Sequence, residues 1–149
     1  MLRISGGELN VDALVASTCL TSEAIHRRGD PRHSTRPGGK RFKTSGASFV
    51  VSEADFDQFR IQNEDAIAFL SENKQELQTL MAFPGIEDGC LDFGIFFRDV
   101  PAQCDHFPAE LVAIAGVLGL GIELSQYCPR DGDKEIDQDL PPRDLPGQA

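Results

Sequence analysis

Residues 91–98, LDFGIFFR, carry the clearest secondary-structure pattern of the chain. Apolar side chains at the odd positions alternate with Asp92, Gly94, Phe96 and Arg98. A period of two is typical of a strand that buries one of its faces. We therefore expect a strand here, in a sheet with one covered face, and we expect Asp92 to be solvated on the other face.

Stretches of helical spacing lie on both sides of this strand. Before it, apolar residues recur every three or four positions between Asn63 and Pro84, which predicts one long helix. After it, Pro108 fits the first turn of a helix that ends at Gly119. Near the amino terminus, Asn10 provides a side-chain oxygen that caps a helix over about 11–20. Weaker alternation predicts further strands at 2–4, 23–28, 47–52 and 122–127.

The predicted elements follow one another as strand, helix, strand, strand, helix, strand, helix, strand. This order predicts an α+β domain whose antiparallel-rich sheet has helices packed on one face, close to a ferredoxin-like plait with an inserted third helix. The chain has 149 residues, the size of a single domain. We expect that domain to span 1–129, with a mobile basic loop at about 27–46, and we expect 130–149 to be a disordered acidic tail.

The composition is that of a soluble globular protein. Hydrophobic residues make up 40% and charged residues 26%, and no apolar run approaches the roughly 18–20 residues that cross a bilayer. The first twenty residues lack the pattern of a secretory signal, so we expect a cytoplasmic protein without disulfides. The cysteines, which we expect to be reduced and buried, are Cys19, Cys90, Cys104 and Cys128.

The charge of the chain is acidic but unevenly distributed. Twenty-four acids against fourteen bases give a net charge of −10, and such a surface repels phosphates, which argues against general nucleic-acid binding. Seven of the bases lie in one segment rich in glycine and proline: Arg27, Arg28, Arg32, Arg36, Lys40, Arg41 and Lys43. This segment is expected either to bind an anion or to pair with acids of the same molecule.

Three local patterns resemble functional motifs but lack their decisive residues. The acids of 131–139 alternate as in a calcium loop, yet Ile136 occupies the position of the turn glycine. Three glycines within 116–121 end a helix where a dinucleotide fingerprint would open one. Cys104 and His106 form one close pair, whereas a zinc site needs four ligands and a cysteine nucleophile needs an orienting group. We therefore expect no catalytic residue, no metal and no cofactor.

Several short motifs together resemble a family of small bacterial proteins. They are Leu2-Arg3-Ile4-Ser5-Gly6, Arg28-Gly29-Asp30-Pro31, Asp65-Ala66-Ile67-Ala68-Phe69-Leu70, Leu91-Asp92-Phe93-Gly94, Phe107-Pro108-Ala109-Glu110-Leu111 and Gly119-Leu120-Gly121-Ile122-Glu123-Leu124-Ser125. From about Leu2 to Pro129 the chain resembles domain-of-unknown-function family forty-two seventy-nine, although it lacks the tryptophan that members often carry. The resemblance implies a bacterial cytoplasmic α+β domain with no established activity and no catalytic residue to transfer.

Small size, acidic charge and the lack of a catalytic set favour a non-enzymatic protein-interaction domain. One form of this hypothesis is an immunity or antitoxin protein that binds and neutralises a basic toxin, because acidic surfaces steer basic partners. The likeness to small acidic immunity proteins is an analogy at the level of the fold. The acids that we expect to face a partner are Glu53, Asp55, Asp57, Glu87, Asp88 and Asp99.

The alternative is a small anionic-ligand-binding or enzymatic domain that uses the basic loop. Guanidinium groups bind phosphate and carboxylate through two parallel hydrogen bonds. The arginines that would do so are Arg27, Arg28, Arg32 and Arg41. A third hypothesis is a homo-oligomer in which the basic loop of one copy meets the acidic body of another. None of these hypotheses involves nucleic acid or a membrane.

Overall fold

The described part of the chain forms five strands and four helices. The computed structural model describes residues 1–33, 35 and 38–128, so the expected acidic tail at 130–149 lies outside the described residues. The elements are β1 (Leu2–Gly6), α1 (Val11–Ala16), β2 (Ser22–His26), β3 (Ser45–Phe49), α2 (Phe59–Glu72), α3 (Lys74–Met81), β4 (Asp88–Phe96), α4 (Ala109–Val117) and β5 (Gly121–Tyr127).

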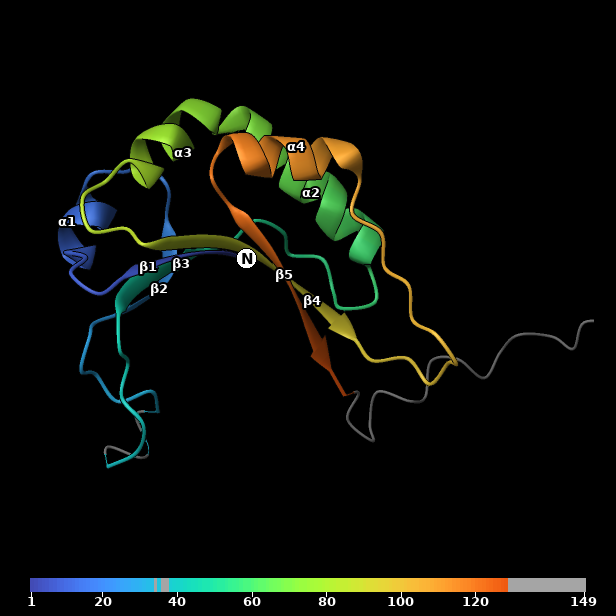
Figure 1. Ribbon diagram of the computed structural model, residues 1–149, viewed down its shortest axis with the longest axis horizontal. Coiled ribbons are helices and arrows are strands. Elements are labelled where there is room, and N and C mark those ends of the chain that lie inside the picture. Colours follow the sequence, from blue (N-terminus) through green and yellow to red (C-terminus); the bar gives the residue numbers. More distant parts are fainter. Residues whose placement is uncertain (34, 36–37, 129–149) are drawn as a thin grey trace, which may run out of the picture.

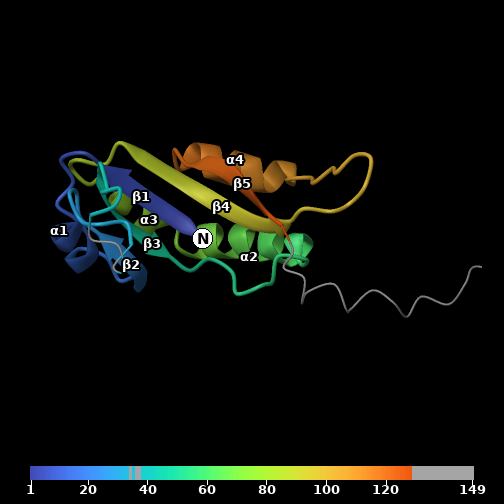
Figure 2. The same cartoon turned by 90° about the horizontal axis from the view of Figure 1, so that it is seen from below.

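These strands form a mixed sheet in the order β2-β3-β1-β4-β5. β1 lies in the middle and is antiparallel to β3 and β4, β2 is antiparallel to β3, and β4 runs parallel to β5. A parallel neighbour requires a crossover, which α4 provides between the end of β4 and the start of β5. The helices cover one face of the sheet (Figures 1 and 2), and we call the opposite face the helix-free face. The expected α+β class is confirmed.

The hydrophobic core lies between the sheet and the helices. Leu2 of β1 and Leu91 of β4 point toward the helices and are fully buried. Leu70, Leu77 and Leu111 meet them from α2, α3 and α4 and are equally buried. Each such side chain stabilises the fold by about 1.5–3 kcal/mol. Because side chains alternate along a strand, the residues next to Leu2 and Leu91 in their strands face away from the helices. Residues on that face are the ones open to a ligand or partner.

The prediction of a single long helix between Asn63 and Pro84 is wrong, because the structure has two helices there. The break falls at Asn73, whose backbone N–H and side-chain amide donate to the Phe69 carbonyl at 3.1 and 2.9 Å. These two bonds close the last turn of α2, and the next turn belongs to α3. The first of the two helices also begins earlier than expected, at Phe59.

The first helix is shorter than expected, since it ends at Ala16 rather than near Leu20. The Thr18 hydroxyl and the Cys19 backbone N–H both donate to the Glu76 carboxylate of α3, at 2.6 and 2.9 Å. These bonds draw the chain off the helical path. The Thr18 bond, supported by the Cys19 bond, stabilises the charged carboxylate and holds the pKa of Glu76 below its usual range.

Two strands are displaced from their expected positions. β3 ends at Phe49 rather than Ser52, because its pairing with both β1 and β2 stops at Phe49. β4 spans Asp88–Phe96 rather than 91–98, because its first residues already pair with β1. In both places the neighbouring strands, and not the local alternation, set the limits of the strand.

The expectation of four buried cysteines is wrong for three of them. All four thiols are free, but Cys90 alone is buried, on β4. Cys19, Cys104 and Cys128 are exposed, because they lie in the segments between or after the regular elements. Within the described residues, no helix has the length and apolar character needed to cross a membrane.

Candidate interaction surface

An aromatic stack stands on the helix-free face beside β2 and β3. The rings of His26 and Phe42 are 4.0 Å apart, and the Arg32 guanidinium lies 5.5 Å from the centre of the Phe42 ring. The His26 ring lies over Gly46, where an added Cβ atom would come within 2.7 Å of it. Burial, and then the charge of Arg32, holds the pKa of His26 below its usual value, so the ring is neutral at neutral pH.

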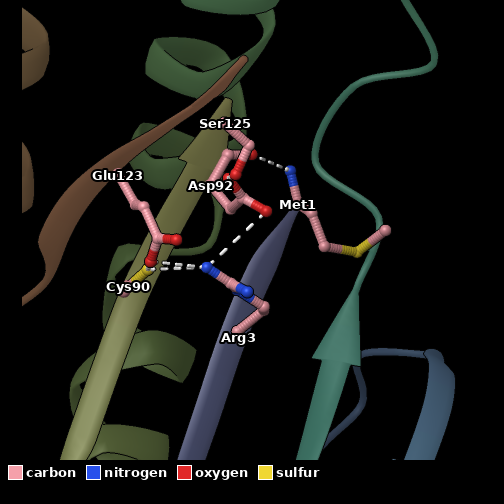
Figure 3. Close-up of polar contacts among 6 residues, drawn as sticks. All are labelled: Met1, Arg3, Cys90, Asp92, Glu123 and Ser125. Carbon is pink, nitrogen blue, oxygen red and sulfur yellow. Dashed lines mark hydrogen bonds and ion pairs between the residues drawn. The ribbon is translucent and has the colours of Figure 1, made fainter. Parts of the chain in front are cut away.

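The middle of the helix-free face holds an ionic cluster in which the Arg3 guanidinium contacts two carboxylates (Figure 3). The Arg3 guanidinium lies 2.6 Å from the Glu123 carboxylate and 3.6 Å from that of Asp92. Asp92 also accepts a 2.6 Å hydrogen bond from the Ser125 hydroxyl. Its side chain is 16% exposed, so the expectation of a solvated acid is wrong. The reason is β5, which runs beside β4 and brings Ser125 and Glu123 to it.

Cys90 belongs to the same cluster, 3.7 Å from Arg3 and 3.7 Å from Glu123. Burial raises the pKa of its thiol, so the sulfur stays protonated at neutral pH and is a poor nucleophile. The described chain also contains no group of three His, Cys, Asp or Glu side chains that would suit a metal ion. The cluster therefore joins β1, β4 and β5 and offers no reactive group.

The basic loop turns two of its arginines toward acids of the same molecule. Arg27 binds Asp12 of α1 through two hydrogen bonds of 2.6 and 3.1 Å. The Arg27 bond holds the pKa of Asp12 below its usual range. Arg28 lies 2.8 Å from the Glu8 carboxylate. Both pairs are exposed to solvent, and such pairs contribute little to stability, but they occupy the two cations.

The remaining two predicted arginines do not complete an anion clamp. Arg41 donates to the Gly29 carbonyl at 2.6 Å and so braces the loop itself. Arg32 lies over Phe42 and faces the helix-free face of the sheet. The structure thus directs the four arginines to four different places.

Four of the six predicted acids lie at the end of the sheet where β4 stops. Three precede α2 and one follows β4 by three residues: Glu53, Asp55, Asp57 and Asp99. Glu87 and Asp88 stand at the start of β4, roughly 26 Å away along a strand of nine residues. All six are exposed, and within 4.0 Å none has a Lys, Arg or His partner among the residues that the structure describes.

Buried Gln62 of α2 fixes the loop that carries three of these acids. Its side-chain amide donates to the carbonyls of Asp55 and Gly94, at 2.9 and 2.8 Å, and the residue is 6% exposed. The Phe96 N–H donates to the Phe56 carbonyl at 3.3 Å, which ties the same loop to β4. The loop is therefore ordered before a partner arrives, and this order lowers the entropic cost of binding.

The sequence analysis did not single out Gln62, although a signal was present. Gln62 lies four and eight residues before Ala66 and Leu70, on the buried stripe of α2. A polar side chain at a buried helix position needs hydrogen-bond partners, so its place in the stripe indicates a structural role.

Exposed apolar side chains belong to the same loop and strand ends as the four acids. Phe56 stacks on Tyr127 with ring centroids 4.8 Å apart, and the Phe97 N–H donates to the Tyr127 carbonyl at 2.8 Å. The exposed fractions are 39% for Phe56, 47% for Tyr127, 52% for Phe97 and 48% for Val100. We call these four side chains, together with Glu53, Asp55, Asp57 and Asp99, the acidic aromatic end.

Comparisons with protein-family models, with curated proteins and with solved structures found no match for the chain. The resemblance to domain-of-unknown-function family forty-two seventy-nine stays a prediction. The acidic aromatic end is the feature from which we infer a function.

Proposed function

We propose that this protein is a non-enzymatic interaction domain that binds a basic protein partner with its acidic aromatic end. One observation carries the proposal: four exposed acids, none of them ion-paired within the described chain, accompany four exposed apolar side chains on an ordered loop and strand end. Aromatic anchors with a charged rim are typical of protein interfaces. Unpaired carboxylates also speed the encounter with a basic partner.

The anchor point of this surface is a hollow of about 230 Å³ beside Phe56. Its walls include Phe56, Tyr127 and Asp92, and also Met1, whose terminal ammonium group donates to the Asp92 backbone carbonyl at 3.0 Å. Aromatic faces attract a cation, so we propose that a Lys or Arg side chain of the partner contacts the exposed rings of Phe56 and Tyr127.

Within this class, we propose an immunity or antitoxin protein that neutralises a basic toxin, by analogy with small acidic immunity proteins at the level of the fold. The net charge of −10 and the protonated state of the Cys90 thiol support a binding role over a catalytic one. For the fold we propose a ferredoxin-like plait extended by β5. The support for it is the order β2-β3-β1-β4, in which every neighbouring pair is antiparallel.

The alternative, an anionic-ligand site in the basic loop, has less support. Arg27 and Arg28 already bind Asp12 and Glu8. Arg32 faces a hollow of about 460 Å³, but acids line that hollow as well as bases.

The test is capture of a partner from a lysate of the native host by the tagged full chain, at low and high salt. The variant is Glu53→Gln/Asp55→Asn/Asp57→Asn, which removes three charges from the acidic aromatic end. The matched control is Glu23→Gln/Glu72→Gln/Glu110→Gln, which removes three exposed charges elsewhere. We expect a basic partner whose capture falls with salt, is lost in the variant and persists in the control.

Equal loss in the two triple variants would show that net charge alone attracts the partner, and the proposed surface would be wrong. Capture that survives in both variants would also reject it. Capture of an anionic small molecule, abolished by Arg32→Ala and insensitive to both triple variants, would favour the alternative.

A further inference from the structure

The outer edge of β5 is open to pairing. Among the described residues no strand pairs with its outer side, while its inner side pairs with β4 over seven residues without a bulge. β2, at the opposite edge of the sheet, is shorter and has a register shift between Ser22 and Ala24. Short, bulged and charged edge strands resist pairing with another chain, whereas regular ones invite it.

α4 lies beside this edge, and its exposed side is apolar except for Glu110 in the first turn. One side of the helix buries Leu111 and Ala115, while Val112 and Val117 on the other side are 51% and 66% exposed. Figure 2 shows α4 along the same margin of the molecule as β5. Such an exposed apolar helix side is typical of a surface that another element covers. In the described chain, nothing covers this outer side.

The segment that forms this margin carries little charge. Between Ala109 and Tyr127 the charged residues are Glu110 and Glu123, and Glu123 is paired with Arg3. Two copies of a chain with a net charge of −10 repel each other over most of their surfaces. The α4–β5 margin carries no cluster of carboxylates, so it is the part of the surface that repels a second copy least.

We propose that the β5 strands of two copies pair antiparallel, and that their α4 helices pack together above the joined sheet. Pairing all seven residues places the two-fold axis at Leu124, with Glu123 opposite Ser125 of the second copy, so no like charges face each other. A two-fold axis normal to the sheet keeps the helices of both copies on one face. The outer sides of Val112 and Val117 are then covered by the same helix of the second copy.

The test is the mass of the full chain in solution, measured by sedimentation equilibrium over a range of concentrations. We expect twice 16.3 kDa at high concentration and a return to 16.3 kDa on dilution. The variant Val112→Glu/Val117→Glu should have the mass of one chain throughout. The control Ala68→Glu/Thr79→Glu places the same charges on exposed positions of α2 and α3 and should still dimerise.

A single-chain mass for the unchanged protein at every concentration would overturn the proposal, and so would a dimer that survives in the Val112→Glu/Val117→Glu variant. Hydrogen exchange shows whether a second copy or other residues of the same chain cover the outer edge of β5. We expect the protection of the β5 amides to fall on dilution; protection independent of concentration, or its absence, would reject the second copy.

Discussion

The two ends of the helix-free face share a plan but differ in what they leave available. At each end an aromatic ring lies over a glycine of the sheet, His26 over Gly46 and Phe56 over Gly94. At each end a second ring, Phe42 or Tyr127, stacks on the first. At the basic-loop end, two of the cations are held by Asp12 and Glu8, whereas the four carboxylates of the acidic aromatic end have no cation within reach in the described chain.

This difference shows that the number of charges in a segment does not determine how many are free to bind. The basic loop has the denser charge in the sequence, but α1 and the turn before it supply acids to its arginines. The segment before α2 carries fewer charges than the basic loop. The hydrogen bonds that Gln58 and Gln62 make to it involve the Asp55 backbone, so the carboxylates stay free. Availability is a property of the tertiary arrangement.

The largest effect that we predict separates the two glycines. A Cβ atom at Gly46 would lie 2.6 Å from the Ile4 backbone carbonyl as well as 2.7 Å from the His26 ring, and the backbone of the central strand cannot move aside. At Gly94 the close atoms all belong to the Phe56 ring, which can turn away. We expect Gly46→Ala to lower the free energy of unfolding by about 3 kcal/mol or more, and Gly94→Ala by about 1–3 kcal/mol.

Urea unfolding of the two variants measures this difference. Gly94→Ala should also weaken partner capture by the acidic aromatic end, since it displaces the anchor ring without changing any charge. Equal losses of stability in the two variants would mean that the sheet adjusts at Gly46, and that the two ends do not differ in rigidity.

Local patterns predicted much of the fold because most elements obey their own periodicity. The strand around Leu91 and the helix that follows Pro108 were found where apolar spacing placed them, and the stripe after Asn63 is helical but is divided between two helices. Their limits were missed where distant partners decide them. The Glu76 carboxylate ends the first helix through bonds to Thr18 and Cys19, and no pattern within 11–20 contains that information.

The candidate site was harder to predict, because it depends on which segments meet. Alternation alone indicated that Asp92 faces solvent, but the parallel β5 strand brings Ser125 and Glu123 beside it. Acids at Glu53 and Asp99 lie far apart in the sequence and come to one end of the sheet only once β4 pairs and Phe56 docks on it. Predicting such a cluster needs the strand order.

The next largest effect tests whether the acidic aromatic end is ordered in advance. Gln62→Ala leaves the carbonyls of Asp55 and Gly94 without their donor, and we expect it to lower the free energy of unfolding by about 1–3 kcal/mol. Gln78→Ala, at an exposed position of α3, is the control and should change it by less than about 0.5 kcal/mol. Urea unfolding measures both. A Gln62→Ala protein as stable as the control would mean that solvent replaces these bonds at no cost.

A smaller effect concerns the cations held at the basic-loop end. In a double-mutant cycle of Arg28→Ala and Glu8→Ala, we expect a coupling energy below about 1 kcal/mol that shrinks with added salt, because both side chains are exposed. The weakness of this pair does not free Arg28 for a ligand, since any anion must compete with a carboxylate already 2.8 Å away. A coupling energy that is large and insensitive to salt would show that the pair is shielded from solvent.

The smallest effect is a titration. His26 should titrate below its usual pKa, and Phe42→Ala should move its pKa upward by more than Arg32→Ala does, because burial is the larger cause of the shift. Since the pKa in the folded state lies below that in the unfolded chain, the stabilising contribution of the neutral ring is complete above the unfolded value and is lost as the pH falls through the folded one. NMR titration of the imidazole protons measures all three proteins. If Arg32→Ala has the larger effect, the guanidinium charge and not the aromatic stack controls this end of the sheet, and a ligand anion that neutralises Arg32 would then raise the pKa of His26.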